Sequence, residues 1–348
     1  MRYLINIQSF SRVELLAFCK EVAQSNEPLW LKAIYVFIED YLSDELNIAV
    51  QTSGTTGTPK QMNILKNKMK ISANKTAAYF NFEKGQKVLL TLPATYIAAK
   101  MMIVRALEHQ LNLICVAPQN DFINNFNDEI YFCPLVPLQA QKALSNKASL
   151  KKIQQIKHIL LGGAPVNKQL LNTLQKQPNN YYHSYGMTET LSHIAVRTLN
   201  KPYSEYFTVL HNISITKDNR DCLIINAPQF SGEPIVTNDI VEIKNEKSFK
   251  WLGRYDNVIN SGGIKIIPEQ VEAAIEHLIK KPFYIIGEAN EQLGEQVVLY
   301  IETAELFDTK TLLTQLKNCL PKHHAPKKII LLSAFERTHS GKIIKRKL

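Results

Sequence analysis

The chain has 348 residues, of which 45% are apolar and 21% charged, and its formal net charge is +10. This length predicts about two domains, the composition is that of a globular protein, and the positive charge favours anionic partners. With no apolar run of about 18 residues, no signal-peptide pattern and five cysteines in no metal-site spacing, we expect a reduced cytoplasmic protein without a membrane span.

The first half of the chain alternates predicted helices with predicted strands. Ser11 and Pro28 open two helices within residues 9–43, because each precedes an apolar pattern of helical period. A strand at 46–50 leads into a loop, and a helix follows at 66–82. Strands at 88–92, 111–116, 130–133 and 159–161 then alternate with helices at 97–107, 138–144 and 170–174. This order predicts an α/β fold with a mainly parallel sheet covered by helices on both faces.

The second half changes character near residue 192. Short β-rich runs at 210–215, 223–225 and 241–243 predict an antiparallel or barrel-like subdomain, and residues 253–257 are typical of a joint. Beyond the joint, we expect a strand pair ending near 267, helices at 268–279 and 309–320, and strands at 283–286, 296–301 and 328–332. The prediction is therefore a large N-terminal domain, 1–252, and a small mobile α+β C-terminal domain, 253–348.

The loop at 51–60 reads Q-T-S-G-T-T-G-T-P-K and is predicted to bind phosphate. Its glycines let backbone N–H groups turn inward as an anion nest, and its hydroxyls and lysine add donors suited to phosphate. A plain Gly/Thr turn is the alternative, and a Walker A loop is excluded because the G-K-[ST] ending is missing. The candidate ligands are Thr52, Ser53, Gly54, Thr55, Thr56, Gly57 and Lys60.

Five further motifs follow the loop. They read G-G-A-P at 162–165, S-Y-G-M-T-E at 184–189, T-N-D at 237–239, G-R-Y-D-N-V-I-N-S-G-G at 253–263 and R-T-H-S-G-K at 337–342. Each alone is more often a turn or a solvated surface segment. Together, in this order, they resemble the adenylate-forming superfamily of acyl-CoA synthetases, carrier-loading adenylation domains and luciferases, over residues 51–347.

The resemblance implies a role for each motif residue. ATP or AMP is expected to contact Gly162, Gly163, Ala164, Pro165, Ser184, Tyr185, Gly186 and Met187, with Asp239 and Arg254 on the ribose. Thr188 is expected at the α-phosphate and Glu189 on Mg²⁺, a cation that prefers carboxylate and phosphate oxygens. Lys342 corresponds to the catalytic lysine, Asp256 to the hinge of the small domain, and Ser261, Gly262 and Gly263 to the passage for coenzyme A.

The implied reaction joins a carboxylate to AMP with release of pyrophosphate, and then forms a thioester with coenzyme A. The run Y-G-M-T-E-T-L-S-H and the short chain are most similar to bacterial 2-succinylbenzoate–CoA ligases of menaquinone synthesis. That acid keeps a second carboxylate, which needs a partner when buried. The candidates for contacting the acid are Tyr96, Lys100, Arg105, Ser192, His193 and Arg197, each of which is about as easily explained as surface.

The sequence also departs from the superfamily pattern. About fifty residues precede the phosphate loop, where relatives carry well over a hundred, so the oligomeric state stays open. Tyr96 stands where an aromatic–histidine pair is common. Asn238 replaces a glycine, and because asparagine tolerates a positive φ better than other residues, we expect the turn there to be preserved. The alternatives left open are another acid, a carrier protein as thiol acceptor, and a nucleotide-binding regulator without catalysis. Nothing in the sequence supports a luciferase-like oxygenase, and a nucleic-acid partner is disfavoured because lysines are not clustered with aromatics.

Overall fold

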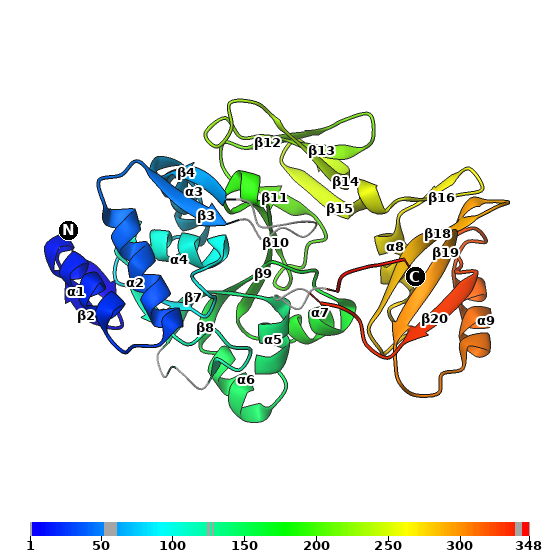
Figure 1. Cartoon of the computed structure of the whole chain (residues 1–348), viewed down its shortest axis with the longest axis horizontal. Coiled ribbons are helices and arrows are strands. Elements are labelled where there is room, and N and C mark those ends of the chain that lie inside the picture. Colours follow the sequence, from blue (N-terminus) through cyan, green and yellow to red (C-terminus); the bar gives the residue numbers. More distant parts are fainter. Residues whose placement is uncertain (1, 52–60, 124–125, 127–128, 338–342, 348) are drawn as a thin grey trace. The chain divides into compact units, whose positions relative to one another are not determined.

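The computed structural model describes residues 2–51, 61–123, 126, 129–337 and 343–347 (Figure 1). The chain divides into one unit of residues 1–214 and 226–235 and a second of residues 215–225 and 236–348. The predicted boundary at 252/253 remains a prediction. Across the described helices, none combines the length and apolar character needed to cross a bilayer.

The first unit begins with a short hairpin of two strands and a pair of helices, and continues as an alternation of strands and helices (Figure 1). Ser11 caps α1 through a capping box, in which Ser11 N–H donates to Glu14 Oε2 at 2.6 Å. The strands are β1 (Tyr3–Ile5), β2 (Gln8–Phe10), β3 (Asn47–Gln51), β4 (Gln61–Leu65), β5 (Lys87–Leu90), β6 (Asn112–Cys115), β7 (Ile130–Leu135), β8 (Ile156–Leu161), β9 (Asn180–Gly186), β10 (His193–Thr198) and β11 (Phe207–Val209). The helices are α1 (Arg12–Gln24), α2 (Leu29–Leu42), α3 (Lys66–Phe80), α4 (Ile97–Glu108), α5 (Pro137–Ala143), α6 (Lys147–Ile153) and α7 (Lys168–Leu174), with a 3-10 turn, η2, at Thr188–Thr190.

The sheet of this unit is mixed. Its strands lie in the order β11-β10-β9-β8-β7-β5-β6-β1-β2. The five pairings from β1 through β9 are parallel, whereas β1/β2, β9/β10 and β10/β11 are antiparallel. The predicted mainly parallel sheet is therefore the centre of a mixed one, and short connections make its two ends antiparallel.

Both faces of the sheet are buried, as predicted. On one face, Leu89 and Ile159 belong to a core cluster with side chains of α5, α6 and α7. Their neighbours in the strands alternate to the opposite face, where Phe132 packs on Phe80 of α3 with ring centroids 4.7 Å apart. This two-sided burial explains why the strands read as nearly continuous apolar runs.

The second unit contains two groups of strands. The first group, in the order β12-β13-β14-β15, includes an antiparallel β14/β15 pair. The second is a sheet in the order β17-β16-β19-β18, with β20 parallel to β19. The elements are β12 (Ser214–Lys217), β13 (Cys222–Asn226), β14 (Ile235–Asn245), β15 (Ser248–Arg254), η3 (Tyr255–Asn257), β16 (Ile259–Ser261), β17 (Ile264–Ile266), α8 (Pro268–Ile275), β18 (Phe283–Asn290), β19 (Gly294–Glu302), α9 (Thr309–Cys319) and β20 (Lys328–Leu332).

The predicted strand at 210–215 is wrong. The chain turns there, with Asn212 at a φ of +58°, and strands flank the turn at Phe207–Val209 and Ser214–Lys217. The apolar pattern of the segment reflects buried side chains at Leu210 and Ile213 rather than a continuous strand. The predicted antiparallel character of this region is confirmed by the β14/β15 pairing.

Candidate active site

The Gly162–Pro165 segment follows β8 and packs directly on β9. Ser184 Oγ donates to the Leu161 carbonyl at 2.9 Å, and a Cβ added at Gly162 would lie 2.6 Å from Ser184 Oγ. Gly163 has a φ of +78°, which a side chain would strain. Both glycines are therefore needed for this strand end, and the structure brings the predicted G-G-A-P and S-Y-G motifs together.

A tight 3-10 turn carries Thr188 and Glu189 between the antiparallel strands β9 and β10. Met187 N–H donates to Thr190 Oγ1 at 3.1 Å, which closes the turn. Gly186 lies opposite His193, and a Cβ there would overlap His193 Cα and the Ser192 carbonyl oxygen. The turn leaves Glu189 exposed and Thr188 half-buried.

An exposed carboxylate on a rigid turn fits Mg²⁺. Among the described residues no group of three acidic, histidine or cysteine side chains is arranged for a metal ion. Glu189 would therefore supply one protein ligand, and the phosphates of a nucleotide with water would supply the others, which is the usual way in which proteins bind Mg²⁺.

Arg105, Ser192 and His193 form a buried polar cluster directly after this turn. Arg105 Nη2 donates to Ser192 Oγ at 2.6 Å, and Ser192 Oγ lies 3.3 Å from His193 Nδ1. His193 Nε2 lies 3.3 Å from Thr76 Oγ1, which donates in turn to the Ser72 carbonyl. Because arginine only donates and a carbonyl only accepts, one direction satisfies every link: Ser192 donates to Nδ1, and Nε2–H donates to Thr76.

The electrostatics of this cluster centre on Arg105. Arg105 is 2% exposed, and its Nε has no hydrogen-bond partner. In the part of the chain that the structure describes, no acidic side chain forms an ion pair with its guanidinium. Burial lowers the pKa of Arg105 to about 9. Burial, and then the charge of Arg105, hold the pKa of His193 well below its usual range, so this histidine is neutral at pH 7.

Arg197 does not join this cluster. Its Nη2 lies 3.2 Å from His183 Nδ1, and its guanidinium lies over the Phe207 ring, 4.9 Å from the centroid. His183 Nε2 lies 3.2 Å from the Ala164 carbonyl. Burial lowers the pKa of His183 to about 3, so the neutral ring accepts from Arg197 and donates to Ala164, which fixes the end of the G-A-P segment.

Lys100 also points elsewhere. Its Nζ donates to the Ala49 carbonyl at 3.4 Å and lies 5.3 Å from the centroid of the Phe37 ring. Tyr96 precedes α4 and its N–H donates to the Pro93 carbonyl. Of the six candidates for the acid site, the structure brings together Arg105, Ser192 and His193.

In the second unit, Asp239 and Arg254 are directly opposite residues of β14 and β15. Asp239 is 7% exposed, and its Oδ1 accepts from Trp251 Nε1 at 3.0 Å and lies 3.6 Å from Arg254 Nη1. Arg254 Nη2 lies 2.8 Å from Oδ2 of Asp256 in the following 3-10 turn. The predicted ribose ligands are thus neighbours, and Asp256 is bound to one of them.

Gly262 and Gly263 form the two-residue turn of the β16/β17 hairpin. Their φ values are +58° and +82°, the left-handed pair that such hairpins require. Gly262 N–H donates to the Leu293 carbonyl at 2.8 Å, and Ser261 is buried. The turn alone explains both glycines, and their expected contact with coenzyme A stays a prediction.

Two predicted parts lie outside the described residues: the loop ligands Thr52, Ser53, Gly54, Thr55, Thr56, Gly57 and Lys60, and the catalytic Lys342. The strands on either side of the loop, β3 and β4, are antiparallel partners. Arg337 and Ile343, on either side of 338–342, form an antiparallel bridge. Both carboxylate oxygens of Glu302 accept from Arg337 at one end of this bridge, at 2.7 and 2.5 Å, and hydrogen bonding from Arg337 keeps the pKa of Glu302 low.

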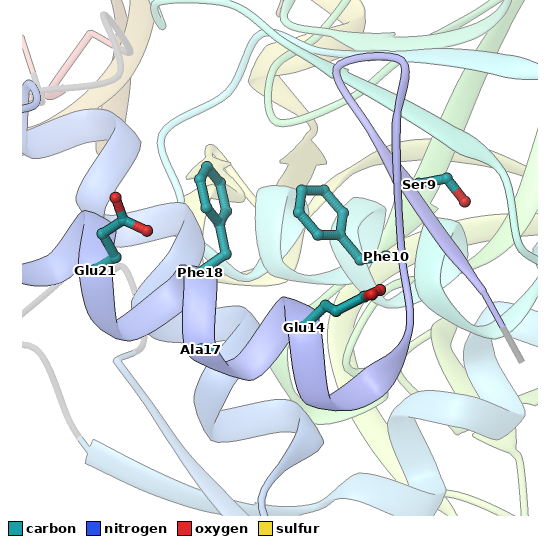
Figure 2. A pocket seen from close by; sticks show the side chains of 6 residues that line it. All are labelled: Ser9, Phe10, Glu14, Ala17, Phe18 and Glu21. Carbon is teal, nitrogen blue, oxygen red and sulfur yellow. The ribbon is translucent and has the colours of Figure 1, made fainter.

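Sequence reasoning missed three residues that orient the candidates: Thr76, His183 and Trp251. Each makes its contact across the fold, as when Thr76 meets His193 from α3. The motifs carry no signal for these contacts, because each partner lies on another element. A surface hollow of about 450 Å³ beside α1, lined by Phe10 and Phe18, shares no residue with the motifs (Figure 2).

Comparison with known proteins supports the predicted family. The family model described as AMP-binding enzyme matches residues 37–217. The crystal structure of an acyl-CoA synthetase (AMP-forming)/AMP-acid ligase II-like protein from Dyadobacter fermentans is 34% identical, with a TM-score of 0.66, and the match covers 94% of this chain and 95% of that one.

Relatives with lower sequence identity also match most of the chain. A probable 2-succinylbenzoate–CoA ligase of Mycobacterium tuberculosis is 24% identical, over 88% of this chain and 84% of its own length. An o-succinylbenzoate CoA synthetase of Bacillus subtilis, solved with ATP and a magnesium ion, has a TM-score of 0.72 at 20% identity, over 98% of this chain and 83% of that chain, which shows the shared fold. The chain therefore belongs to the AMP-binding enzyme family, the adenylate-forming superfamily of the sequence motifs, and is an AMP-forming acid–CoA ligase.

Proposed function

We propose that this ligase activates a dicarboxylic acid, 2-succinylbenzoate, as its acyl-AMP and transfers the acyl group to coenzyme A. The observation that carries the proposal is the buried guanidinium of Arg105, which has an unpartnered Nε and no acidic partner among the described side chains. The names of relatives at 24% and 26% identity agree with this substrate.

A buried cation of this kind calls for an anion. An unpaired charge in a protein interior is strongly unfavourable, and a carboxylate in bidentate contact with a guanidinium relieves the cost for both groups. Among the described residues Arg105 makes one hydrogen bond, to Ser192 Oγ, and it keeps donors for a ligand. The carboxylate of the diacid that is not activated supplies the missing charge.

Ser192 and His193 support Arg105 in this role. The chain of hydrogen bonds from Arg105 to Ser72 has one consistent direction, so the Ser192 hydroxyl accepts from the guanidinium and the neutral imidazole adds no competing positive charge. Ser192 and His193 follow the turn with Thr188 and Glu189 directly in sequence, and Arg105 reaches them from α4. We propose that the acid lies between this cluster and the nucleotide, with its reacting carboxylate toward the turn.

For the first half-reaction, two anions must meet, so the protein's contribution is to neutralise charge and align them. We assign the β- and γ-phosphates to the hydroxyls of the 52–60 loop and Lys60, Mg²⁺ to Glu189, and the developing charge at the α-phosphate to Thr188 and Lys342. For the second, we propose that domain 253–348 rotates at Asp256, withdraws Lys342 and admits coenzyme A past Ser261–Gly263.

The test is pyrophosphate release from ATP and Mg²⁺ with 2-succinylbenzoate, benzoate or hexanoate, each with and without coenzyme A. We expect release with the diacid alone, and a thioester only when coenzyme A is present. Release with a different acid would keep the reaction class and change the identity of the acid substrate. Formation of acyl-AMP without a coenzyme A thioester would indicate a carrier-protein acceptor. No release with any acid, while AMP still binds, would favour a nucleotide-binding regulator.

A further inference from the structure

Two side chains without a role so far, Arg220 and Asn238, are connected to the proposed ribose ligands of the second unit. Asn238 lies in the middle of β14, next to Asp239. Arg220 lies in the turn between β12 and β13, where Asp218 Oδ2 accepts from its Nε at 2.8 Å. Both side chains are half-buried.

Asn238 bridges the turn to the hinge residue. Its Oδ1 accepts from Arg220 Nη1 at 3.1 Å, and its Nδ2 donates to Asp256 Oδ1 at 3.0 Å and Oδ2 at 3.3 Å. Since a guanidinium only donates and a carboxylate only accepts, these partners fix which way the amide points. The amide of Asn238 satisfies both neighbours at once, since its oxygen accepts and its nitrogen donates.

The bridge continues to the ribose pair. Asp256 Oδ2 accepts from Arg254 Nη2 at 2.8 Å, and Arg254 Nη1 lies 3.6 Å from Asp239 Oδ1. The Arg254 guanidinium therefore lies between two carboxylates, and the position of one of them depends on Asn238. Arg220 is held in turn by its own contacts with Asp218, the Thr237 carbonyl and the ring of Tyr255.

We propose that Arg220 and Asn238 are positioning residues for nucleotide binding: through Asp256 they set the orientation of Arg254 beside Asp239, and so the recognition of the ribose hydroxyls. The inference rests on the proposed ribose role of Asp239 and Arg254. Each exposed contact is weak alone. Alternating donors and acceptors in one connected network leave few other arrangements for Arg254.

The test compares how tightly the full chain binds AMP and its 3′-deoxy analogue, by titration calorimetry. Asn238→Asp keeps the acceptor for Arg220, removes the donor to Asp256 and places two carboxylates side by side. Arg220→Met removes the other end of the bridge. Asn245→Asp is the matched control, since Asn245 lies on the same strand, is exposed, and accepts only a local bond from Lys247 N–H.

We expect the wild-type chain to bind AMP about tenfold or more tightly than 3′-deoxy-AMP, as a hydrogen bond to a charged group predicts. Asn238→Asp and Arg220→Met are expected to lose most of this preference, with affinity for the deoxy nucleotide nearly unchanged, while Asn245→Asp keeps it. A preference that survives both substitutions would overturn the proposal, and so would equal weakening of both nucleotides, which is the sign of a general structural defect.

These outcomes separate the inference from the proposed substrate. AMP binding requires no acid, so failure of 2-succinylbenzoate in the pyrophosphate assay leaves the AMP preference measurable and unchanged. A wild-type chain that binds both nucleotides equally would remove the ribose role of Asp239 and Arg254, and the positioning role would fall with it.

Discussion

Replacing Arg105 by methionine is expected to stabilise the ligand-free protein. A pKa that falls from 12.5 to about 9 corresponds to about 5 kcal/mol for keeping the buried guanidinium charged. Exchanging buried charges for apolar side chains of similar size has raised stability by about 1–4 kcal/mol, and the lost bond to Ser192 takes back about 1 kcal/mol. We therefore expect a gain of roughly 0–3 kcal/mol in the free energy of unfolding, measured with guanidinium chloride.

The same substitution is expected to damage diacid activation. Removing one partner of a buried charge pair costs about 2–5 kcal/mol, so the Michaelis constant for 2-succinylbenzoate in the pyrophosphate assay is expected to rise roughly 100-fold. A monocarboxylate such as benzoate has no second charge to lose, and its activation is expected to stay constant or improve. Arg105→Lys keeps the charge without the bidentate geometry and should give an intermediate value.

Arg12→Met is the control for loss of an arginine as such. Arg12 is half-exposed and pairs with Asp44 at 3.0 Å, so its removal is expected to change stability by less than about 1 kcal/mol and substrate affinity not at all. The reasoning about Arg105 is refuted if Arg105→Met lowers stability and leaves the Michaelis constant for the diacid unaltered. That pair of results would make the guanidinium a structural part of the fold.

Three further expectations concern other parts of the molecule. Gly186→Ala places a Cβ against backbone atoms of Ser192 and His193. It is expected to lower the free energy of unfolding by about 3 kcal/mol or more, the upper end of the usual cost of overpacking, and so to lower the melting temperature. Glu302→Gln is expected to slow acyl-AMP formation several-fold without weakening ATP binding, in single-turnover measurements, because Glu302 anchors Arg337 beside the segment with Lys342. His183 and His193 must stay neutral when folded, with pKa values below that of the unfolded chain. Stability is therefore full above about pH 6.5 and falls below it, for His183 down to about pH 3, at up to about 1.4 kcal/mol per pH unit for each histidine. Denaturant titrations at pH 7.5, 6.5 and 5.5 with a constant midpoint would contradict this.

Much of the fold was predictable because local patterns carried it. Apolar runs that are buried on both faces predict central parallel strands, and β5, β7 and β8 are such strands. The antiparallel ends of the sheet were less predictable, since β1 and β2 have three residues each and show no strong period. β1 joins this hairpin to the sheet by pairing with the distant strand β6, and no local pattern encodes that pairing.

The candidate site was likewise predictable only in part. The backbone requirement at Gly162, Gly163 and Gly186 was readable, because glycine in a motif reports a close approach or a left-handed turn. The choice among Lys100, Arg105 and Arg197 was not. Each is a cation among apolar residues in sequence. Only the fold shows that Lys100 and Arg197 lie over the rings of Phe37 and Phe207, and that Arg105 alone of the three is fully buried.

Asn238 shows what a departure from a motif can mean. Asparagine in place of glycine suggested that a left-handed turn was being preserved, yet Asn238 lies in an extended strand and no such turn exists there. The substitution adds an amide whose oxygen meets Arg220 and whose nitrogen meets Asp256. Asn238 is therefore better explained by the two side chains that it holds in place, Arg220 and Asp256, than by the glycine that it replaces.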